Sequence, residues 1–153
     1  MVLYLASDLL WATRIKSCAE DLGVPARPVR TMDMLEARLA DSPVTGVLLD
    51  LAAGEEGQEG VIAFAMLGRL KGGNAETRRS VEERGGGDGE KPEVIRVVVF
   101  GPHVQGADLV RAKREGADVV MARGALAANL PRVLQELSAA AGGRSEMRDQ
   151  LTD

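Results

Sequence analysis

Two aspartates stand at the ends of apolar runs that are typical of buried strands. Val44–Leu51 is apolar apart from Thr45 until it reaches Asp50, and Asp8 follows the apolar run Val2–Ala6. In open parallel α/β sheets, ligands gather outside the carboxyl ends of the strands, so Asp50 is where we first look for function. Both residues also have structural interpretations: Asp8 as a helix cap, and Asp50 as an acceptor for loop N–H groups.

The chain has too few histidines and cysteines for a disulfide or for a zinc site built from these residues. His103 is the single histidine and Cys18 the single cysteine, so no intramolecular disulfide can form. His103 has no neighbouring histidine or cysteine with which to hold zinc. The segment 101–106 around it fits neither the P-loop nor the dinucleotide fingerprint. We therefore expect His103 to be a solvated loop residue.

The bulk composition fits one globular domain. Of the 153 residues, 45% are hydrophobic and 27% charged, which is an ordinary balance. A formal net charge of -4 and an aromatic content of 3% argue against nucleic-acid partners, which need positive charge or stacking rings. No apolar run reaches the roughly 18 residues of a membrane span, and no basic region precedes the first apolar run. We expect a cytoplasmic protein without membrane contact.

Five apolar runs alternate with five segments of helical periodicity. The expected strands are Val2–Ala6, Ala26–Val29, Val44–Leu51, Val94–Phe100 and Val119–Ala122. The expected helices follow Asp8, run from a cap at Thr31 to about Ala40, cover Val61–Leu70 and Gly106–Glu115, and end the fold with the stripe Leu130, Val133, Leu134 and Leu137. Pro131 is expected in the first turn of the last helix, with Asn129 as its cap. Trp11 is expected to belong to the core rather than to a partner surface.

Two segments fall outside this pattern. Residues 72–92 are rich in glycine and in charges of both signs, and such a composition buries too little apolar area to offset its ordering entropy. We interpret them as a flexible insertion within a single domain of residues 1–140. Residues 141–153 are expected to form a polar C-terminal tail.

The order of the elements is strand then helix, five times. This order predicts an α/β fold with a five-stranded parallel sheet, right-handed crossovers and helices on both faces. The natural strand order is 2-1-3-4-5, which is the doubly wound, flavodoxin-like arrangement.

At this point the chain resembles the CheY-like receiver domain of bacterial two-component response regulators. The segments that carry the resemblance are Val47–Asp50, where that family places its phosphoacceptor aspartate, and Gly116–Asp118 before the fifth strand. The resemblance implies that Asp50 accepts a phosphoryl group in a phosphorelay. It also implies a Mg²⁺ site made from Asp8, Asp50, a carbonyl near Ala52 and waters, which are the oxygen ligands that this ion prefers.

Three positions depart from the family's pattern. Ser7 stands where the family has the other acid of its metal-binding pair, and Gly101 stands where it has the serine or threonine that binds the phosphoryl group. Arg123-Gly124 replaces the lysine and the following proline, so a cation remains but with another shape and reach. Arg123 could pair with Asp50 and occupy the space of the phosphate or metal. We interpret the chain as a degenerate receiver, or pseudo-receiver.

The leading hypothesis is a non-enzymatic signalling module that binds another signalling protein, a kinase or an effector, without conventional aspartyl phosphorylation. By the resemblance, residues 105–115 and the outer side of 125–137 are the first surfaces to test, and homodimerisation is a further option. One alternative is a working Mg²⁺-dependent receiver that uses Asp50. The other is a small flavodoxin-like nucleotide-binding protein, against which the missing phosphate fingerprint counts.

Overall fold

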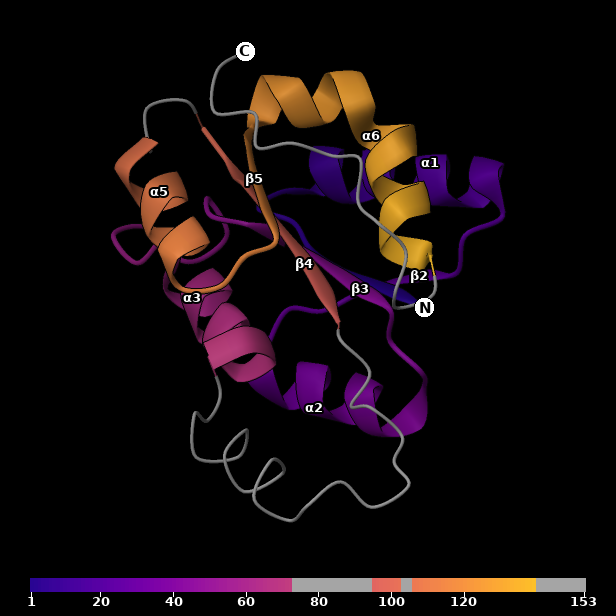
Figure 1. The fold of residues 1–153 in the computed structure, drawn as a ribbon, viewed down its shortest axis with the longest axis horizontal. Coiled ribbons are helices and arrows are strands. Elements are labelled where there is room, and N and C mark those ends of the chain that lie inside the picture. The colour runs from indigo at the N-terminus through magenta and orange to yellow at the C-terminus, as the bar shows by residue number, and fades with distance from the viewer. Residues whose placement is uncertain (73–94, 103–105, 140–153) are drawn as a thin grey trace.

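The computed structural model describes residues 1–72, 95–102 and 106–139 (Figure 1). The predicted insertion, apart from Gly72, lies outside these residues, as do His103 and the predicted tail, and the domain limits 1–140 stay a prediction. The strands are β1 (Val2–Leu5), β2 (Ala26–Pro28), β3 (Gly46–Asp50), β4 (Arg96–Gly101) and β5 (Val119–Ala122). The helices are α1 (Leu9–Leu22), α2 (Met32–Asp41), α3 (Val61–Leu67), the π-helix η1 (Gly68–Gly72), α5 (Gly106–Arg114) and α6 (Arg123–Ser138).

All five strands pair in parallel in the order β2-β1-β3-β4-β5, which confirms the predicted topology. Helices α1 and α6 cover one face of the sheet, and α2, α3 and α5 cover the other (Figure 1). Each face has its own apolar core: Trp11, Ile15 and Leu134 belong to the first, and Leu35, Met66 and Leu109 to the second. Trp11 is only 5% exposed, so its expected place in the core is confirmed.

The first helices begin and end where their capping residues predict. The Asp8 carboxylate accepts a hydrogen bond from the backbone N–H of Trp11, and the Thr31 hydroxyl accepts one from Met34. These side chains satisfy backbone donors that have no partner within a helix. Gly23 ends α1 in a left-handed conformation with φ 69°, which glycine adopts without steric cost.

The predicted start of the last helix is wrong. Helix α6 begins at Arg123, directly after β5, so Pro131 lies inside the helix instead of in its first turn. Asn129 is no cap, because its side-chain amide donates to the carbonyl of Ala125 within the helix. A proline inside a helix removes one backbone hydrogen bond and bends the axis. Figure 1 shows α6 change direction partway along its length.

The two ends of the bent helix α6 contact different parts of the sheet. Its first turn carries Arg123 at the carboxyl edge of the sheet, while its last turn packs on the start of β3. The Thr45 hydroxyl donates to the carbonyl of Leu137, and a Cβ added at Gly46 would lie 2.6 Å from the Cβ of Leu137. Glycine at position 46 is thus required by the close approach of β3 and α6.

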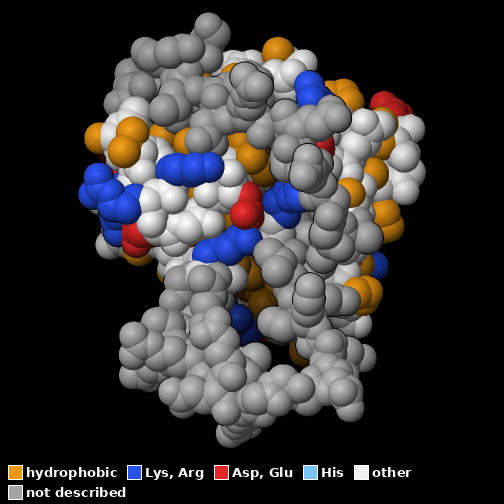
Figure 2. All heavy atoms as spheres, in the orientation of Figure 1, with side chains coloured by type: hydrophobic (Ala, Val, Ile, Leu, Met, Phe, Trp, Pro, Cys, Tyr) orange, Lys and Arg blue, Asp and Glu red, His pale blue; other side chains and the backbone are white. Residues whose placement is uncertain are grey.

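The predicted helix over Val61–Leu70 ends its α-helical part at Leu67 and continues as the π-helix η1. Two ion pairs fix η1: Arg69 pairs with Glu36 of α2, and the Nζ atom of Lys71 lies 2.7 Å from an Asp118 carboxylate oxygen. The same Asp118 oxygen accepts the backbone N–H of Val97 at 2.7 Å. Figure 2 shows basic side chains grouped around an acidic one on the face that carries α5 and β5.

Candidate functional site

The parallel sheet brings the residues singled out from the sequence to one edge. Asp50 ends β3 beside Phe100 of β4, and Gly101 ends β4 beside Ala122 of β5. Asp8 follows β1, and Arg123 opens α6 immediately after β5. Every one of these residues therefore lies at or just beyond the carboxyl end of a strand, as the predicted topology requires.

Asp50 is completely buried, with 0% exposure, and it is the only buried charged residue among those the structure describes. One carboxylate oxygen, Oδ2, accepts the backbone N–H of Ser7 at 3.0 Å, and the other, Oδ1, accepts that of Ala52 at 2.8 Å. Hydrogen bonds to a charged acceptor are stronger than neutral ones and offset part of the cost of burying the charge. Asp50 thus joins the loops that follow β1 and β3.

Arg123 places a positive charge close to this carboxylate. Its Nη2 atom lies 3.8 Å from Oδ1 of Asp50, while its side chain keeps 35% of its surface exposed. The guanidinium carbon also lies 5.8 Å from the centre of the Trp11 ring, a distance at which a cation is attracted to an aromatic face. Trp11 in turn packs on Phe100, with ring centres 5.2 Å apart. The expected pairing of Arg123 with Asp50 is present.

Two polar atoms beside Asp50 have no hydrogen-bond partner among the described residues. These are the hydroxyl oxygen of Ser7 and Nε of Arg123, both buried. Ser7 approaches Asp50 through its backbone N–H, so its hydroxyl does not stand in for the acid that the resemblance expects.

The described residues do not fit the Mg²⁺ site that the receiver fold implies. Asp8 uses one carboxylate oxygen to cap α1, and both oxygens of Asp50 accept backbone N–H groups without any exposed surface. A Mg²⁺ ion would need carboxylate oxygens that are open to it, and here the Arg123 guanidinium lies close to Oδ1 of Asp50. Within the described ranges, no three histidine, cysteine, aspartate or glutamate side chains cluster as a metal site would require. Metal binding by Asp8 and Asp50 stays a prediction.

Gly101 provides no hydroxyl group at the end of β4. It is the last residue of β4 and is buried, and its hydrogen side chain has nothing to donate to a phosphoryl oxygen. Gly101 as the equivalent of the family's hydroxyl-bearing residue stays a prediction from the resemblance, and a glycine lacks the hydroxyl that the family uses there.

Sequence reasoning missed two features of this edge. Leu9 and Leu10, at the start of α1, are 77% and 75% exposed, and a cavity of about 350 Å³ opens beside Leu9. The sequence carried a signal for Leu10, which falls outside the three- and four-residue spacing that places Ile15 and Ala19 in the core. It carried none for Leu9, which precedes Ala12 by three residues. The cavity had no such signal, since its walls come from strands, loops and helices that are far apart in the sequence, between residues 4 and 12, at 28–30, at 53–54 and at Ile62.

None of the helices in the described part of the chain is long and apolar enough to cross a membrane.

No family model matches this chain, and no curated protein sequence matches it. Solved structures do match. A receiver domain of a Bacteroides fragilis response regulator shares 16% identity over 92% of this chain and 97% of its own, with a TM-score of 0.62. The Francisella response regulator 1452 receiver domain shares 12% identity over 90% and 94%, with a TM-score of 0.59. The receiver domain of a Syntrophus aciditrophicus histidine kinase shares 19% identity over 95% and 98%, with a TM-score of 0.57.

The similarity covers nearly the whole length of this chain and of each matched domain. At these low sequence identities it shows a shared fold and nothing more. With its parallel 2-1-3-4-5 sheet and helices on both faces, the chain has the fold of a response-regulator receiver domain.

Proposed function

We propose that this chain is a pseudo-receiver: a non-enzymatic signalling module that acts by binding other proteins and is not switched by conventional aspartyl phosphorylation. The observation that carries the proposal is the state of Asp50. An aspartate that accepts a phosphoryl group must present a free carboxylate oxygen to the donor. Here both oxygens accept backbone N–H groups, the residue has 0% exposure, and Arg123 lies 3.8 Å away.

The neighbouring positions support the same proposal. Gly101 offers no hydroxyl to a phosphoryl group, and Ser7 offers no carboxylate to a metal. The Arg123 guanidinium is a permanent cation that already neutralises the Asp50 charge. To free one carboxylate oxygen, phosphorylation would have to break the hydrogen bond from Ser7 to Oδ2, or the hydrogen bond from Ala52 and the ion pair with Arg123 at Oδ1.

The experiment is incubation of the folded chain with Mg²⁺ and either acetyl phosphate or beryllofluoride. Intact mass reports a covalent phosphoryl group, and amide chemical shifts of Ser7 and Ala52 report any change at Asp50. We expect neither to change. The control is Asp50→Asn, which cannot form the adduct. A phosphoryl adduct in the wild-type chain that is absent from this variant would overturn the proposal in favour of a working receiver.

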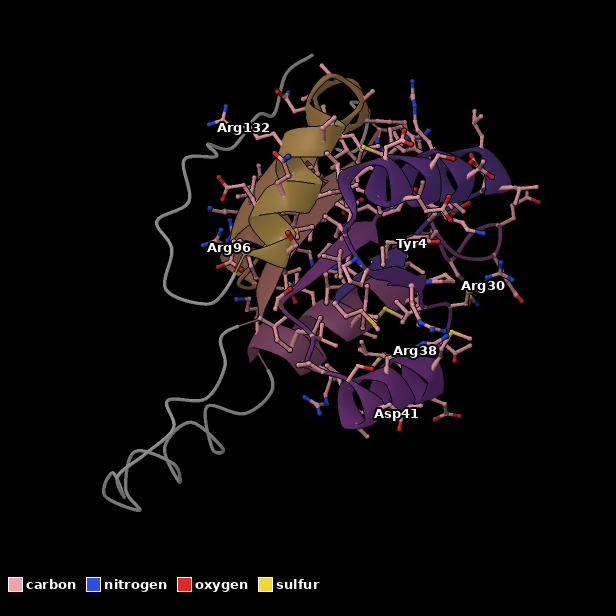
Figure 3. All side chains as sticks on the ribbon, turned by 90° about the vertical axis from the view of Figure 1, so that its right-hand side faces the viewer. Tyr4, Arg30, Arg38, Asp41, Arg96 and Arg132 are labelled. Carbon is pink, nitrogen blue, oxygen red and sulfur yellow. The ribbon has the colours of Figure 1, made fainter. Side chains whose placement is uncertain are left out.

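The partner of such a module is proposed to be another signalling protein, a kinase or an effector. The resemblance directs attention to the α5–β5–α6 face, where Val110 is 48% exposed beside the basic side chains of Arg111, Lys113 and Arg114. Figure 3 shows Arg96 and Arg132 on the side of the molecule that carries α6, opposite Tyr4 and Arg30.

A further inference from the structure

Three large apolar side chains at the carboxyl edge of the sheet are exposed to solvent. Leu9 and Leu10 are 77% and 75% exposed, and Val61 is 62% exposed. They lie in the first turns of α1 and α3, the helices that follow β1 and β3. The only other large hydrophobic residue exposed in the described part of the chain is Val110 on α5. The fold does not need the two leucines, because α1 packs on the sheet through Trp11 and other residues of its opposite side.

A cavity adjoins one of these side chains, Leu9, and Ile62, the neighbour of Val61 in the sequence. It has a volume of about 350 Å³, with Leu9 and Ala12 of α1 on one side and Ile62 of α3 on another. Tyr4 and Leu5 of β1 also line it. It opens where the strand order reverses between β1 and β3, which is the place where doubly wound folds bind their ligands. An apolar cavity next to exposed leucines gives an incoming side chain a place to anchor.

The rim of the cavity is acidic. Gly54 lines the cavity, and the loop that continues from it carries three exposed glutamates, Glu55, Glu56 and Glu59. The loop folds back on itself, so that a Cβ added at Gly54 would lie only 3.4 Å from the Cα of Glu59. Arg30 is the one basic residue that lines the cavity. Asp8 lines the cavity as well, whereas the exposed Arg14 lies one turn beyond Leu10 on α1. The excess of negative charge therefore lies on the cavity side of the apolar surface, and that side complements a basic partner.

We propose that this carboxyl-edge patch, formed by Leu9, Leu10, Val61 and the adjoining cavity, binds a basic amphipathic helix of a partner protein. Apolar residues on one face of that helix cover the leucines and enter the cavity, and lysines or arginines beside them meet Glu55, Glu56 and Glu59. The inference rests on the proposed function as a protein-binding module, and it names the surface and the chemistry of the partner. It does not depend on whether Asp50 can be phosphorylated.

The test uses a synthetic helical peptide with leucines at i, i+3, i+4 and i+7 and lysines elsewhere, and a matched peptide with glutamate in place of lysine. Calorimetry measures affinity, and amide chemical shifts locate the binding site, without Mg²⁺ or any phosphoryl donor. A failure here therefore leaves the phosphorylation experiment untouched. We expect the lysine peptide to bind with shifts centred on the carboxyl-edge patch, and to weaken as salt rises because the charges on the rim are screened.

Variants then separate the two candidate faces. Leu9→Ser with Leu10→Ser should weaken binding at least about tenfold, because the leucines lose their apolar contacts with the peptide. Both residues are exposed, so the unfolding temperature should stay close to that of the wild type. Val110→Ser is the matched control on α5 and should change affinity less than about twofold. Changing Glu55, Glu56 and Glu59 together to Gln should remove the preference for the lysine peptide.

Three results would overturn the inference. One is equal binding, or no binding, of the two peptides. Another is a loss of affinity caused by Val110→Ser as large as that caused by the leucine changes. The third is a dimer of the free chain in sedimentation experiments that Leu9→Ser with Leu10→Ser dissolves, since the patch would then belong to a second copy of this chain.

Discussion

The ion pair between Arg123 and Asp50 can be measured with a double-mutant cycle. The cycle compares the wild type, Asp50→Asn, Arg123→Met and the double variant. Arg123→Met keeps most of the aliphatic length of the side chain and removes its charge. Asp50→Asn keeps the shape of the carboxylate and removes its charge.

The geometry sets the size of each effect. At 3.8 Å, two unit charges attract by roughly 4 kcal/mol when the effective dielectric constant is about 20. The Arg123 side chain is 35% exposed, so solvent screens part of this attraction and desolvation opposes more of it. We expect a coupling free energy of about 1–2 kcal/mol, within the usual range for contacting residues.

The single variants should differ in a defined order. Asp50→Asn should cost about 2–4 kcal/mol, because an amide oxygen can accept only one of the two backbone N–H groups while the NH₂ group faces the other. Arg123→Met should cost about 1–2 kcal/mol, since the carboxylate keeps both backbone hydrogen bonds. Arg123 also contacts the Trp11 ring, but that loss occurs on both sides of the cycle and cancels.

The assay is urea unfolding followed by fluorescence of Trp11, the single tryptophan of the chain. It lies next to both Arg123 and Phe100, so its signal reports on this region. The slope of the unfolding free energy against urea should stay constant across the four proteins, and only the midpoint should move. A coupling energy indistinguishable from zero, or an Asp50→Asn variant as stable as the wild type, would refute the account of Asp50 as a held, buried anion.

Three further predictions concern the scaffold. In urea unfolding, Gly46→Ala should destabilise the fold by about 1–3 kcal/mol because the new methyl group meets α6. Gly68→Ala places its methyl group in open space on a helical backbone and should stabilise the fold by roughly 0.5–1 kcal/mol, and the opposite order would contradict the packing. Asp118→Ala should lower the free energy of unfolding by about 2–3 kcal/mol because it leaves the N–H of Val97 unpaired. Glu36→Gln removes an exposed ion pair and should lower it by less than about 1 kcal/mol, so equal losses in the two variants would contradict this distinction. Burial raises the pKa of the Tyr4 phenol above its ordinary value of 10.0, with Arg30 opposing and Glu20 adding to the shift, so stability should fall as pH rises through the raised value and less so in Tyr4→Phe. Ultraviolet absorbance of this single tyrosine measures the titration directly, and a midpoint at or below the ordinary value would contradict it.

Much of the architecture was predictable because it depends on local rules. Apolar runs bounded by turn residues predicted all five strands to within a few residues, and the alternation with helices limited the topology to the parallel order that the structure has. Asp8 and Thr31 cap their helices as expected, since a cap needs only the residues next to it. The place of Asp50 at the carboxyl edge followed from the same reasoning.

The start of α6 and the end of α3 were not predictable from local pattern. Helix α6 starts without a capping side chain and keeps Pro131 in its interior, because packing against α1 and the sheet stabilises the bent helix despite the lost backbone hydrogen bond. The π-helix after Leu67 makes ion pairs with Glu36 and Asp118, which lie far away in the sequence. Long-range contacts of this kind have no signature in a window of neighbouring residues.

The sequence by itself determined which chemical groups the site can contain: a carboxylate at Asp50, no hydroxyl at Gly101, and a guanidinium in place of an amine at Arg123. Only the tertiary structure decided how these groups are used. Burial of Asp50, its two backbone hydrogen bonds and its 3.8 Å approach to Arg123 arise from the meeting of two loops and one helix end. The exposure of Leu9 and Leu10 beside an acidic rim was decided in the same way, because it depends on which side of α1 the sheet covers.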